Sequence, residues 1–375
     1  HPQGLPFGGK SKFHTVPKTA TAVRAITIEP LLNQFVQQGL NGLLRDSIAK
    51  CSVLSRCLDL TDQSKNQNLA RIGSFDQSYA TIDLSSASDL LSLKLVKLVF
   101  DKYPDFLGQC ISYRSNVVEV DKVDLPMLKY AGMGNATTFP VQSVVFAVLC
   151  IAAITDYRGR VPTMQECKRA ADSIRVFGDD IIVKTEYYHS VEEWITAFGL
   201  RLNRSKTFSK GNFRESCGLD AYMGVDVTPV YLRVDPFSDR LTASDLSSLV
   251  STSNQLWLRG LYKLSDTLRV LVEERMKIRL PLVSPQSGLL GWNDRYGTTT
   301  AHGWDSRLHC LYSSGPVVVA KKRRDKIDGI PALLKSFLTP LIQRGKEHLS
   351  VSEVRFKTRL SRRRVPANAG KPVSM

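Results

Sequence analysis

The sequence predicts an α+β fold in which short central strands are flanked by helices. The chain has 375 residues, 43% of them hydrophobic, which is enough for a large buried core. Its apolar residues follow helical spacing in some segments and strand-like alternation in others. Two apolar segments, residues 173–177 and 181–184, are separated only by Gly-Asp-Asp, which predicts a β-hairpin.

The first half of the chain begins with a loop rich in glycine, proline, lysine and threonine. Its predicted elements are strands at 25–28, 80–84 and near 116–123, and helices at 31–50, 88–100 and 138–155. Ser85, Ser86 or Ser88 is a candidate cap for the helix at 88–100. The helix at 138–155 contains the longest apolar run, eleven residues, which is too short to span a bilayer and indicates a buried helix.

The second half continues with helices on both sides of the Gly-Asp-Asp hairpin. We predict helices at 163–171 and 191–198, a looser hairpin at 213–233, and a mostly helical segment at 243–280. Residues 284–320 are rich in loop-forming residues, and a helix at 330–343 is expected to lead into the C-terminal segment.

The net charge of +16 is concentrated near the C-terminus. Residues 321–375 contain 15 Lys and Arg against 4 Asp and Glu, a net charge of +11. A basic segment of this kind indicates a polyanionic partner such as RNA. The alternatives are a solvated tail that increases solubility and a segment that contacts anionic membrane. The seven cysteines are scattered without a CxxC pair, so the sequence predicts reduced thiols and no zinc site.

The Gly-Asp-Asp turn is the strongest local signal for chemistry. Two apolar strands enclose Asp179 and Asp180, and burial of adjacent carboxylates costs several kcal/mol unless a cation compensates. Asp83 ends a separate short strand, and a two-metal magnesium site needs carboxylates from separate elements. The alternative is an exposed turn without a metal. Asp89, at the start of the next helix, is a candidate for facing a nucleotide or a first-turn acid favoured by the helix dipole.

Three further segments carry residues suited to phosphate chemistry. The glycine-rich stretch at 132–139 precedes a helix, so its backbone can approach a sugar-phosphate closely. Cations at residues 10–24, including Lys18 and Arg24, could neutralise a triphosphate. Lys206 could act as a general acid beside a leaving pyrophosphate. A solvated basic loop and a surface lysine are the alternatives for the last two.

In their order along the chain, these segments resemble the motifs of viral RNA-directed RNA polymerases, in particular the replicase catalytic subunit of positive-strand RNA bacteriophages of the levivirus type. The resemblance extends over roughly residues 14–235 and includes Ile82-Asp-Leu-Ser-Ser-Ala-Ser-Asp89, Met133-Gly-Asn-Ala-Thr-Thr-Phe139 and Phe177-Gly-Asp-Asp-Ile-Ile182. The other matching segments lie at residues 16–30, 60–67, 213–218 and 224–229.

The resemblance implies a right-hand fold of fingers, palm and thumb, with an antiparallel palm sheet flanked by helices. The implied domains are partial fingers at 1–72, palm at 73–212 with a fingers insertion at 104–130, a primer-grip-like hairpin at 213–240, and thumb with a basic tail at 241–375. Proteins of this family extend well upstream of the position of His1. We therefore expect that an N-terminal part is missing.

The resemblance also assigns roles to individual residues. It implies two Mg²⁺ ions, with Mn²⁺ as a possible substitute, bound by Asp83, Asp179 and Asp180. It places triphosphate contacts on Lys18 and Arg24 and the general acid on Lys206. After Phe139 the family usually has a glutamate-containing stretch, which this chain lacks. The candidates for sensing the ribose 2′-hydroxyl are therefore Asp89, Asn135 and Thr138.

The implied function is RNA-templated RNA synthesis from nucleoside triphosphates during replication of a positive-strand RNA virus genome. The implied setting is the cytoplasm of an infected bacterial host, without a membrane, with the host translation elongation factors Tu and Ts as partners. One alternative is a reverse transcriptase, although such enzymes typically have Tyr-x-Asp-Asp where this chain has Phe177-Gly-Asp-Asp. Another is a catalytically incompetent, truncated RNA-binding fragment of a replicase.

Overall fold

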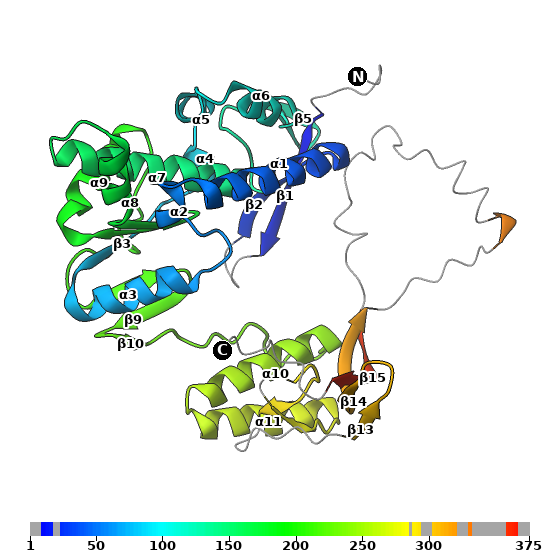
Figure 1. Ribbon diagram of the computed structural model, residues 1–375. Coiled ribbons are helices and arrows are strands. Elements are labelled where there is room, and N and C mark those ends of the chain that lie inside the picture. The colour runs from blue at the N-terminus through cyan, green and yellow to red at the C-terminus, as the bar shows by residue number, and fades with distance from the viewer. Residues whose placement is uncertain are drawn as a thin grey trace. The chain divides into compact units, whose positions relative to one another are not determined.

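The computed structural model describes residues 9–17, 23–284, 287–293, 302–320, 329–331 and 358–366 (Figure 1). The chain forms two compact units, and the division falls between Pro229 and Val230. Each unit has its own hydrophobic core. The two units are described separately below.

The centre of the first unit is a three-stranded antiparallel sheet with the order β3-β7-β6. Its strands are β3 (Tyr79–Asp83), β7 (Asp180–Lys184) and β6 (Ile174–Phe177). Successive side chains of a strand point to opposite faces of its sheet. Ile181 and Val183 of β7 accordingly pack into the main core, whereas Ile182 packs with Ala70 into a smaller cluster on the other face. The sheet is therefore covered on both faces.

Helix α7 (Thr138–Tyr157) is the central helix of the main core (Figure 1). It contacts β6 and several helices, among them α1 (Leu31–Lys50), α5 (Leu93–Val99), α8 (Met164–Ala171) and α9 (Tyr188–Ala197). By length and composition alone α7 could cross a membrane, but 83% of its apolar window is buried inside the unit. Its apolar character is explained by burial on all sides.

The other face of the central sheet is covered by α3 (Ser64–Asp76) and a small antiparallel sheet with the order β10-β9-β8. The strands of this small sheet are β8 (Phe213–Ser216), β9 (Leu219–Tyr222) and β10 (Val225–Asp226). A further sheet has the order β2-β1-β4-β5 and contains β1 (Ser11–Pro17), β2 (Val23–Ile28), β4 (Val117–Val120) and β5 (Val123–Pro126). The remaining helices of this unit that the structure describes are α2 (Leu54–Cys57), α4 (Ala87–Leu90), α6 (Pro104–Ser112) and the 3₁₀ helix η1 (Thr185–Tyr187).

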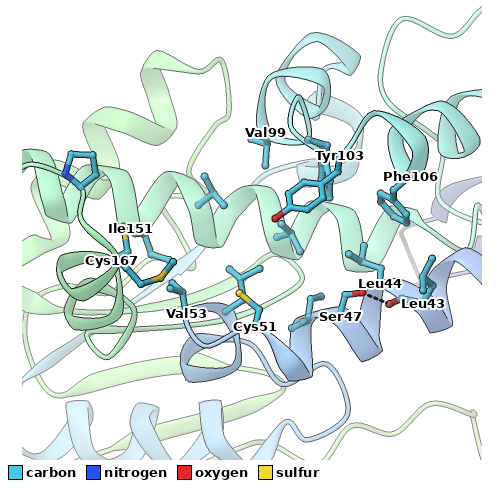
Figure 2. Close-up of a pocket in the computed structure, with 17 residues that line it drawn as sticks. Leu43, Leu44, Ser47, Cys51, Val53, Val99, Tyr103, Phe106, Ile151 and Cys167 are labelled. Atoms are coloured by element: carbon cyan, nitrogen blue, oxygen red, sulfur yellow. Dashed lines mark hydrogen bonds between the residues drawn. The ribbon is translucent and has the colours of Figure 1, made fainter.

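An apolar cavity of about 530 Å³ lies between α1, α7 and the segments beside them (Figure 2). Leu43, Leu44 and Ser47 line it from α1, and Ile151 lines it from α7. None of the aspartates that the sequence singles out lines this cavity. It is therefore a feature of the helix packing and is separate from the candidate site described below.

The second unit combines a helix pair with a three-stranded antiparallel sheet. The pair is α10 (Ala243–Leu258) and α11 (Tyr262–Met276), and a capping box between Thr242 and Asp245 begins α10. The sheet has the order β13-β14-β15, with β13 (Gly303–Asp305), β14 (Cys310–Ala320) and β15 (Thr358–Pro366). A short parallel pair consists of β11 (Leu282–Val283) and β12 (Trp292–Asn293).

Most of the predicted elements are confirmed, and three expectations are wrong. The helix expected at 88–100 is broken into α4 and α5, because Ser92 is extended and its hydroxyl caps α5 by accepting a bond from the Leu95 amide at 3.1 Å. The hairpin expected to extend to 233 ends at Asp226 and has three strands. Residues 310–320, expected to be loop, form the eleven-residue strand β14. The helix expected at 330–343 lies almost entirely outside the described residues.

Candidate active site at the ends of the central strands

The three aspartates that the sequence singled out lie at one end of the central sheet. Asp83 is the last residue of β3, and it is paired across the antiparallel ladder with Asp180, the first residue of β7. Phe177 of β6 is also paired with Asp180, so Gly178 and Asp179 form a two-residue turn beside this pair. The register of two strand pairs therefore brings together carboxylates that are almost 100 positions apart in the sequence.

The shape of the turn is fixed by contact with the first turns of α7. Gly178 has a φ of +65°, and a Cβ there would lie 2.6 Å from a ring carbon of Phe139. The Gly178 amide donates a hydrogen bond to Ser143 Oγ at 3.0 Å, and the Phe139 and Phe177 rings meet edge to face. Glycine is required because other residues are strained at this φ and have no space for a side chain.

Asp180 is the most strongly perturbed of the three acids. Burial, together with the negative charges of Asp179 and Asp83, raises the pKa of its carboxyl group to about 6, and a hydrogen bond from the Cys217 amide opposes this shift. Ser216 Oγ also donates a weak bond to Asp180 Oδ1 at 3.4 Å. The protein therefore holds this carboxylate in an environment that disfavours its charge.

Asp83 is positioned by the segment that follows α9. Asn203 Nδ2 donates a hydrogen bond to Asp83 Oδ2 at 2.8 Å, and the Asn203 amide donates to the Asp83 carbonyl at 2.8 Å. The pKa of Asp83 is raised by burial and by the charge of Asp179, while Asn203 and the Lys206 cation oppose the shift. Asn203 therefore fixes one oxygen of Asp83 and leaves the other available.

Lys206 lies near this site but is paired with a different acid. Its Nζ is 2.6 Å from Glu215 Oε1, and this bond is the main cause that raises the pKa of Lys206, with smaller contributions from the charges of Asp83 and Asp220. Asn203 and Glu215 were not predicted from the sequence, because nothing in it indicates which partner each of them binds.

The three aspartates have the donor chemistry of a divalent-cation site. The described part of the chain contains no cluster of three or more His, Cys, Asp or Glu residues already arranged around one metal position. The charge of Asp179 raises the pKa of both Asp83 and Asp180, so the three carboxylates repel one another. Carboxylate oxygens are the ligands that Mg²⁺ prefers, and a bound cation would relieve this repulsion. The residues present therefore fit magnesium.

Among the other predicted nucleotide contacts that the structure describes, only Asp89 lines a second, smaller cavity. Asp89 forms an ion pair with Lys129, and both residues line a cavity of about 360 Å³ together with Thr27 and Met133. Arg24 is exposed on β2, and no hydrogen bond or ion pair is recorded for it among the described residues. Lys18 lies outside the described residues.

The side chains of Asn135 and Thr138 are buried, which the sequence did not indicate. The Thr138 hydroxyl donates to the Gly132 carbonyl at 3.1 Å, and Asn135 Oδ1 accepts bonds from the amide and hydroxyl of Thr137. Both side chains therefore support the glycine loop, residues 132–137, from inside. Neither of them lines the cavity beside Asp89.

Arg214 supports the site from behind β3, and we predict a large stability effect there. Its side chain is 0% exposed and donates to the backbone carbonyls of Tyr79 (2.5 Å), Phe213 (2.7 Å) and Gly211 (2.8 Å). Arg214→Met leaves these carbonyls without their donor, so we expect the free energy of unfolding to fall by about 3 kcal/mol. Denaturant unfolding measures the loss, with the exposed Arg201→Met as the control. Equal stability of both variants would contradict the prediction.

Comparison with known proteins identifies the family. The model of the RNA replicase beta-chain family matches residues 5–256, so this chain belongs to that family. It is 39% identical over 315 residues to the RNA-directed RNA polymerase subunit beta of Enterobacteria phage SP, covering 83% of this chain and 48% of that protein. It is 36% identical over 219 residues to the RNA-directed RNA polymerase beta chain of Escherichia phage MS2, covering 58% and 37%. The resemblance predicted from the motifs is confirmed, and the chain spans about half the length of these relatives or less.

Solved structures show only a distant similarity. A structure described as an RdRp complex matches with a TM-score of 0.44 and 11% identity, covering 66% of this chain and 24% of that one. Telomerase from Candida albicans matches with the same TM-score and identity, covering 72% and 54%. Similarity at this level is too weak to establish a shared fold.

Proposed function

We propose that this chain carries the catalytic centre of an RNA-directed RNA polymerase that replicates the genome of a positive-strand RNA virus. The observation that carries the proposal is the pairing of Asp83 with Asp180 across β3 and β7, with Asp179 in the adjoining turn. Its similarity to proteins named RNA-directed RNA polymerase subunit beta supports the proposal. The basic C-terminal segment supports an RNA partner.

We further propose that the first unit corresponds to fingers and palm and the second to thumb. The sheet β3-β7-β6 and its flanking helices would form the palm, with boundaries near residues 73 and 212. The sheet β2-β1-β4-β5 would belong to the fingers, and β4 and β5 fall inside the proposed insertion at 104–130. The strands β8 to β10 would form the primer-grip-like hairpin.

In the proposed mechanism Asp83, Asp179 and Asp180 would hold two Mg²⁺ ions, with Asp83 and Asp179 as the principal ligands. Magnesium bound there would supply charge stabilisation for the attacking hydroxyl and for the leaving pyrophosphate. Asn203 orients Asp83 through its 2.8 Å bond, and the bonds from Ser216 and Cys217 orient Asp180.

The remaining residues would act on the triphosphate and the ribose. Lys18 and Arg24 would hold the triphosphate by charge, and Lys206 would give its proton to the leaving pyrophosphate. Glu215 keeps Lys206 protonated until that step, because their ion pair raises the pKa of the lysine. Asp89 is the best placed of the ribose candidates, since the side chains of Asn135 and Thr138 are occupied inside the glycine loop.

A primer-extension assay tests the proposed activity against its alternatives. The purified chain receives a primed RNA template, Mg²⁺ and either ribo- or deoxyribonucleoside triphosphates. Incorporation of ribonucleotides supports an RNA polymerase, whereas preferential incorporation of deoxyribonucleotides would indicate a reverse transcriptase. RNA binding without incorporation of either would favour an incompetent RNA-binding fragment. Co-purification of elongation factors Tu and Ts from a bacterial host tests the proposed partners and the cytoplasmic setting.

The arginines at 362–364 of β15 are proposed RNA contacts, and their removal is expected to change the salt dependence of binding. All three are exposed, and β15 is paired with β14 along its whole length. Replacing them with glutamine keeps the strand, which deletion would not. Each lost phosphate contact lowers the slope of log K against log salt by about 0.7 to 0.9, so the slope should fall by about 2.

Filter binding to a single-stranded RNA, at salt concentrations from about 50 to about 300 mM, measures this change. A matched control removes three exposed lysines of the first unit: Lys94, Lys97 and Lys102. If the control lowers the slope as much as the β15 variant does, the effect is general charge and β15 is not a specific RNA contact.

A further inference from the structure

The glycine loop, residues 132–137, is packed directly on the end of β2. The Thr27 amide donates to the Met133 carbonyl at 2.7 Å. A Cβ on Gly132 would lie 2.1 Å from Thr27 Oγ1, and one on Gly134 would lie 2.0 Å from the Thr27 carbonyl oxygen. The two glycines are therefore needed for this close approach, and the position of the loop depends on the segment that follows β2.

That segment contains a buried carboxylate to which the sequence analysis gave no role. Glu29, between β2 and α1, is 1% exposed. Its Oε2 accepts hydrogen bonds from the Ser115 hydroxyl at 2.6 Å and the Ser115 amide at 3.2 Å, and burial raises its pKa. A buried charge costs several kcal/mol even when it is hydrogen-bonded. The buried carboxylate of Glu29 therefore depends on the hydrogen-bond donors around it.

The second carboxylate oxygen of Glu29, Oε1, and the amide nitrogen of Asn135, Nδ2, are both buried, and neither has a hydrogen-bond partner in the described part of the chain. The Asn135 and Gln37 side chains are near enough to Glu29 to oppose, as smaller contributions, the increase in its pKa that burial causes. Asn135 Oδ1 already accepts two bonds from Thr137, which leaves the amide nitrogen for Glu29. Gln37 Oε1 accepts a bond from the Ala136 amide at 3.2 Å.

We infer that Glu29 is a positioning residue whose carboxylate, set against the Asn135 amide, holds the glycine loop in the shape that forms one wall of the nucleotide site. The loop reaches that site through Met133, which lines the same cavity as Asp89 and Lys129. This inference rests on the proposed polymerase function. Glu29 and Asn135 would affect nucleotide binding through the glycine loop, without touching the nucleotide.

A reciprocal exchange of the two side chains tests the inference. Glu29→Gln places an amide donor against the Asn135 amide donor, and Asn135→Asp places a second carboxylate against Glu29. The double variant restores one donor facing one acceptor, and its carboxylate can still accept both bonds from Thr137. We expect each single variant to raise the KM for the nucleoside triphosphate about tenfold, and the double variant to return within about threefold of wild type.

Three further measurements separate positioning from a loss of fold. RNA affinity and kcat should change less than twofold in each variant, an order-of-magnitude limit for sites that are not coupled. Amide hydrogen exchange at Ala136 should be faster in both single variants and should recover in the double variant. Glu193→Gln, an exposed substitution on α9, is the control and should leave every value unchanged. The inference would be overturned if the KM of the double variant were raised as much as the two single effects together predict. It would also be overturned if the single variants had the KM of the wild type.

The test remains decisive if a single variant does not fold or if the wild-type chain is inactive. If a single variant does not fold, Gln37→Met, which removes the bond to the Ala136 amide, replaces it. An unchanged KM and unchanged Ala136 exchange in that variant would also overturn the inference. If the wild-type chain incorporates no nucleotide, the proposed function has failed, whereas exchange at Ala136 still shows whether Glu29 and Asn135 act as a pair.

Discussion

Replacing Asp179 with asparagine is expected to lower nucleotide incorporation by roughly 10³-fold or more, while RNA binding is retained. A carboxylate that would hold a catalytic cation contributes several kcal/mol to stabilising the developing charge, and a neutral amide does not replace it. The fold should tolerate the change, because Asp179 is an exposed residue of a two-residue turn and asparagine suits such turns. Single-turnover primer extension with saturating Mg²⁺ measures the loss, and filter binding measures RNA affinity.

The β4–β5 hairpin provides a closely matched control. Asp121 is an exposed aspartate in a two-residue turn, and its φ of +48° is also one that asparagine accepts. Asp121→Asn therefore makes the same chemical change in the same kind of turn, away from the candidate site. It should retain full incorporation. Incorporation by Asp179→Asn at the rate of Asp121→Asn would show that Asp179 is not a metal ligand.

The elements predicted best are those whose signal is local. The long apolar run of α7 and the two short apolar segments around Gly178 were predicted correctly, because their lengths and the turn residues between the short segments distinguish a helix from a strand. Strand β14 was missed because its stability comes from pairing with β15, whose paired residues lie between 38 (Ala320 with Thr358) and 54 (Tyr312 with Pro366) positions further along the chain. The break at Ser92 was missed because the apolar spacing continues through it while the serine hydroxyl caps a new helix.

The candidate site shows the same division between local and long-range information. Asp179 and Asp180 were indicated by their own turn, and Asp83 by the end of its strand. Whether Asp83 lies beside Asp180 depends on the register between β3 and β7, which the spacing of residues along the sequence does not determine. The pairing of Lys206 with Glu215 and the burial of Glu29 depend on which segments pack together. The sequence shows that these residues are present but gives no indication of the environment in which the fold places them.

Replacing Asp180 with asparagine is expected to stabilise the metal-free chain at neutral pH and to abolish its stabilisation by Mg²⁺. The folded-state pKa of Asp180, about 6, lies above the ordinary value of an aspartate. The folded protein therefore binds this proton more tightly than the unfolded chain does, and stability falls as the pH rises from about 4 to about 6. Above pH 6 the full cost remains, about 1–2 kcal/mol after allowance for solvent screening. Asparagine carries no charge and avoids this cost.

Denaturant unfolding at pH 5 and pH 7.5, with chelator or with Mg²⁺, measures both parts of the prediction. Without metal, the advantage of Asp180→Asn over wild type should be larger at pH 7.5 than at pH 5, because protonation removes the charge from the wild-type residue as the pH falls. With Mg²⁺ the wild type should gain stability at pH 7.5 and the variant should not, since ligands that bind only the folded state stabilise it. Asp121→Asn should behave as wild type throughout. A metal-free Asp180→Asn variant less stable than wild type at pH 7.5 would mean that the hydrogen bonds from Ser216 and Cys217 outweigh the cost of burying the charge, and that the site is stable without a cation.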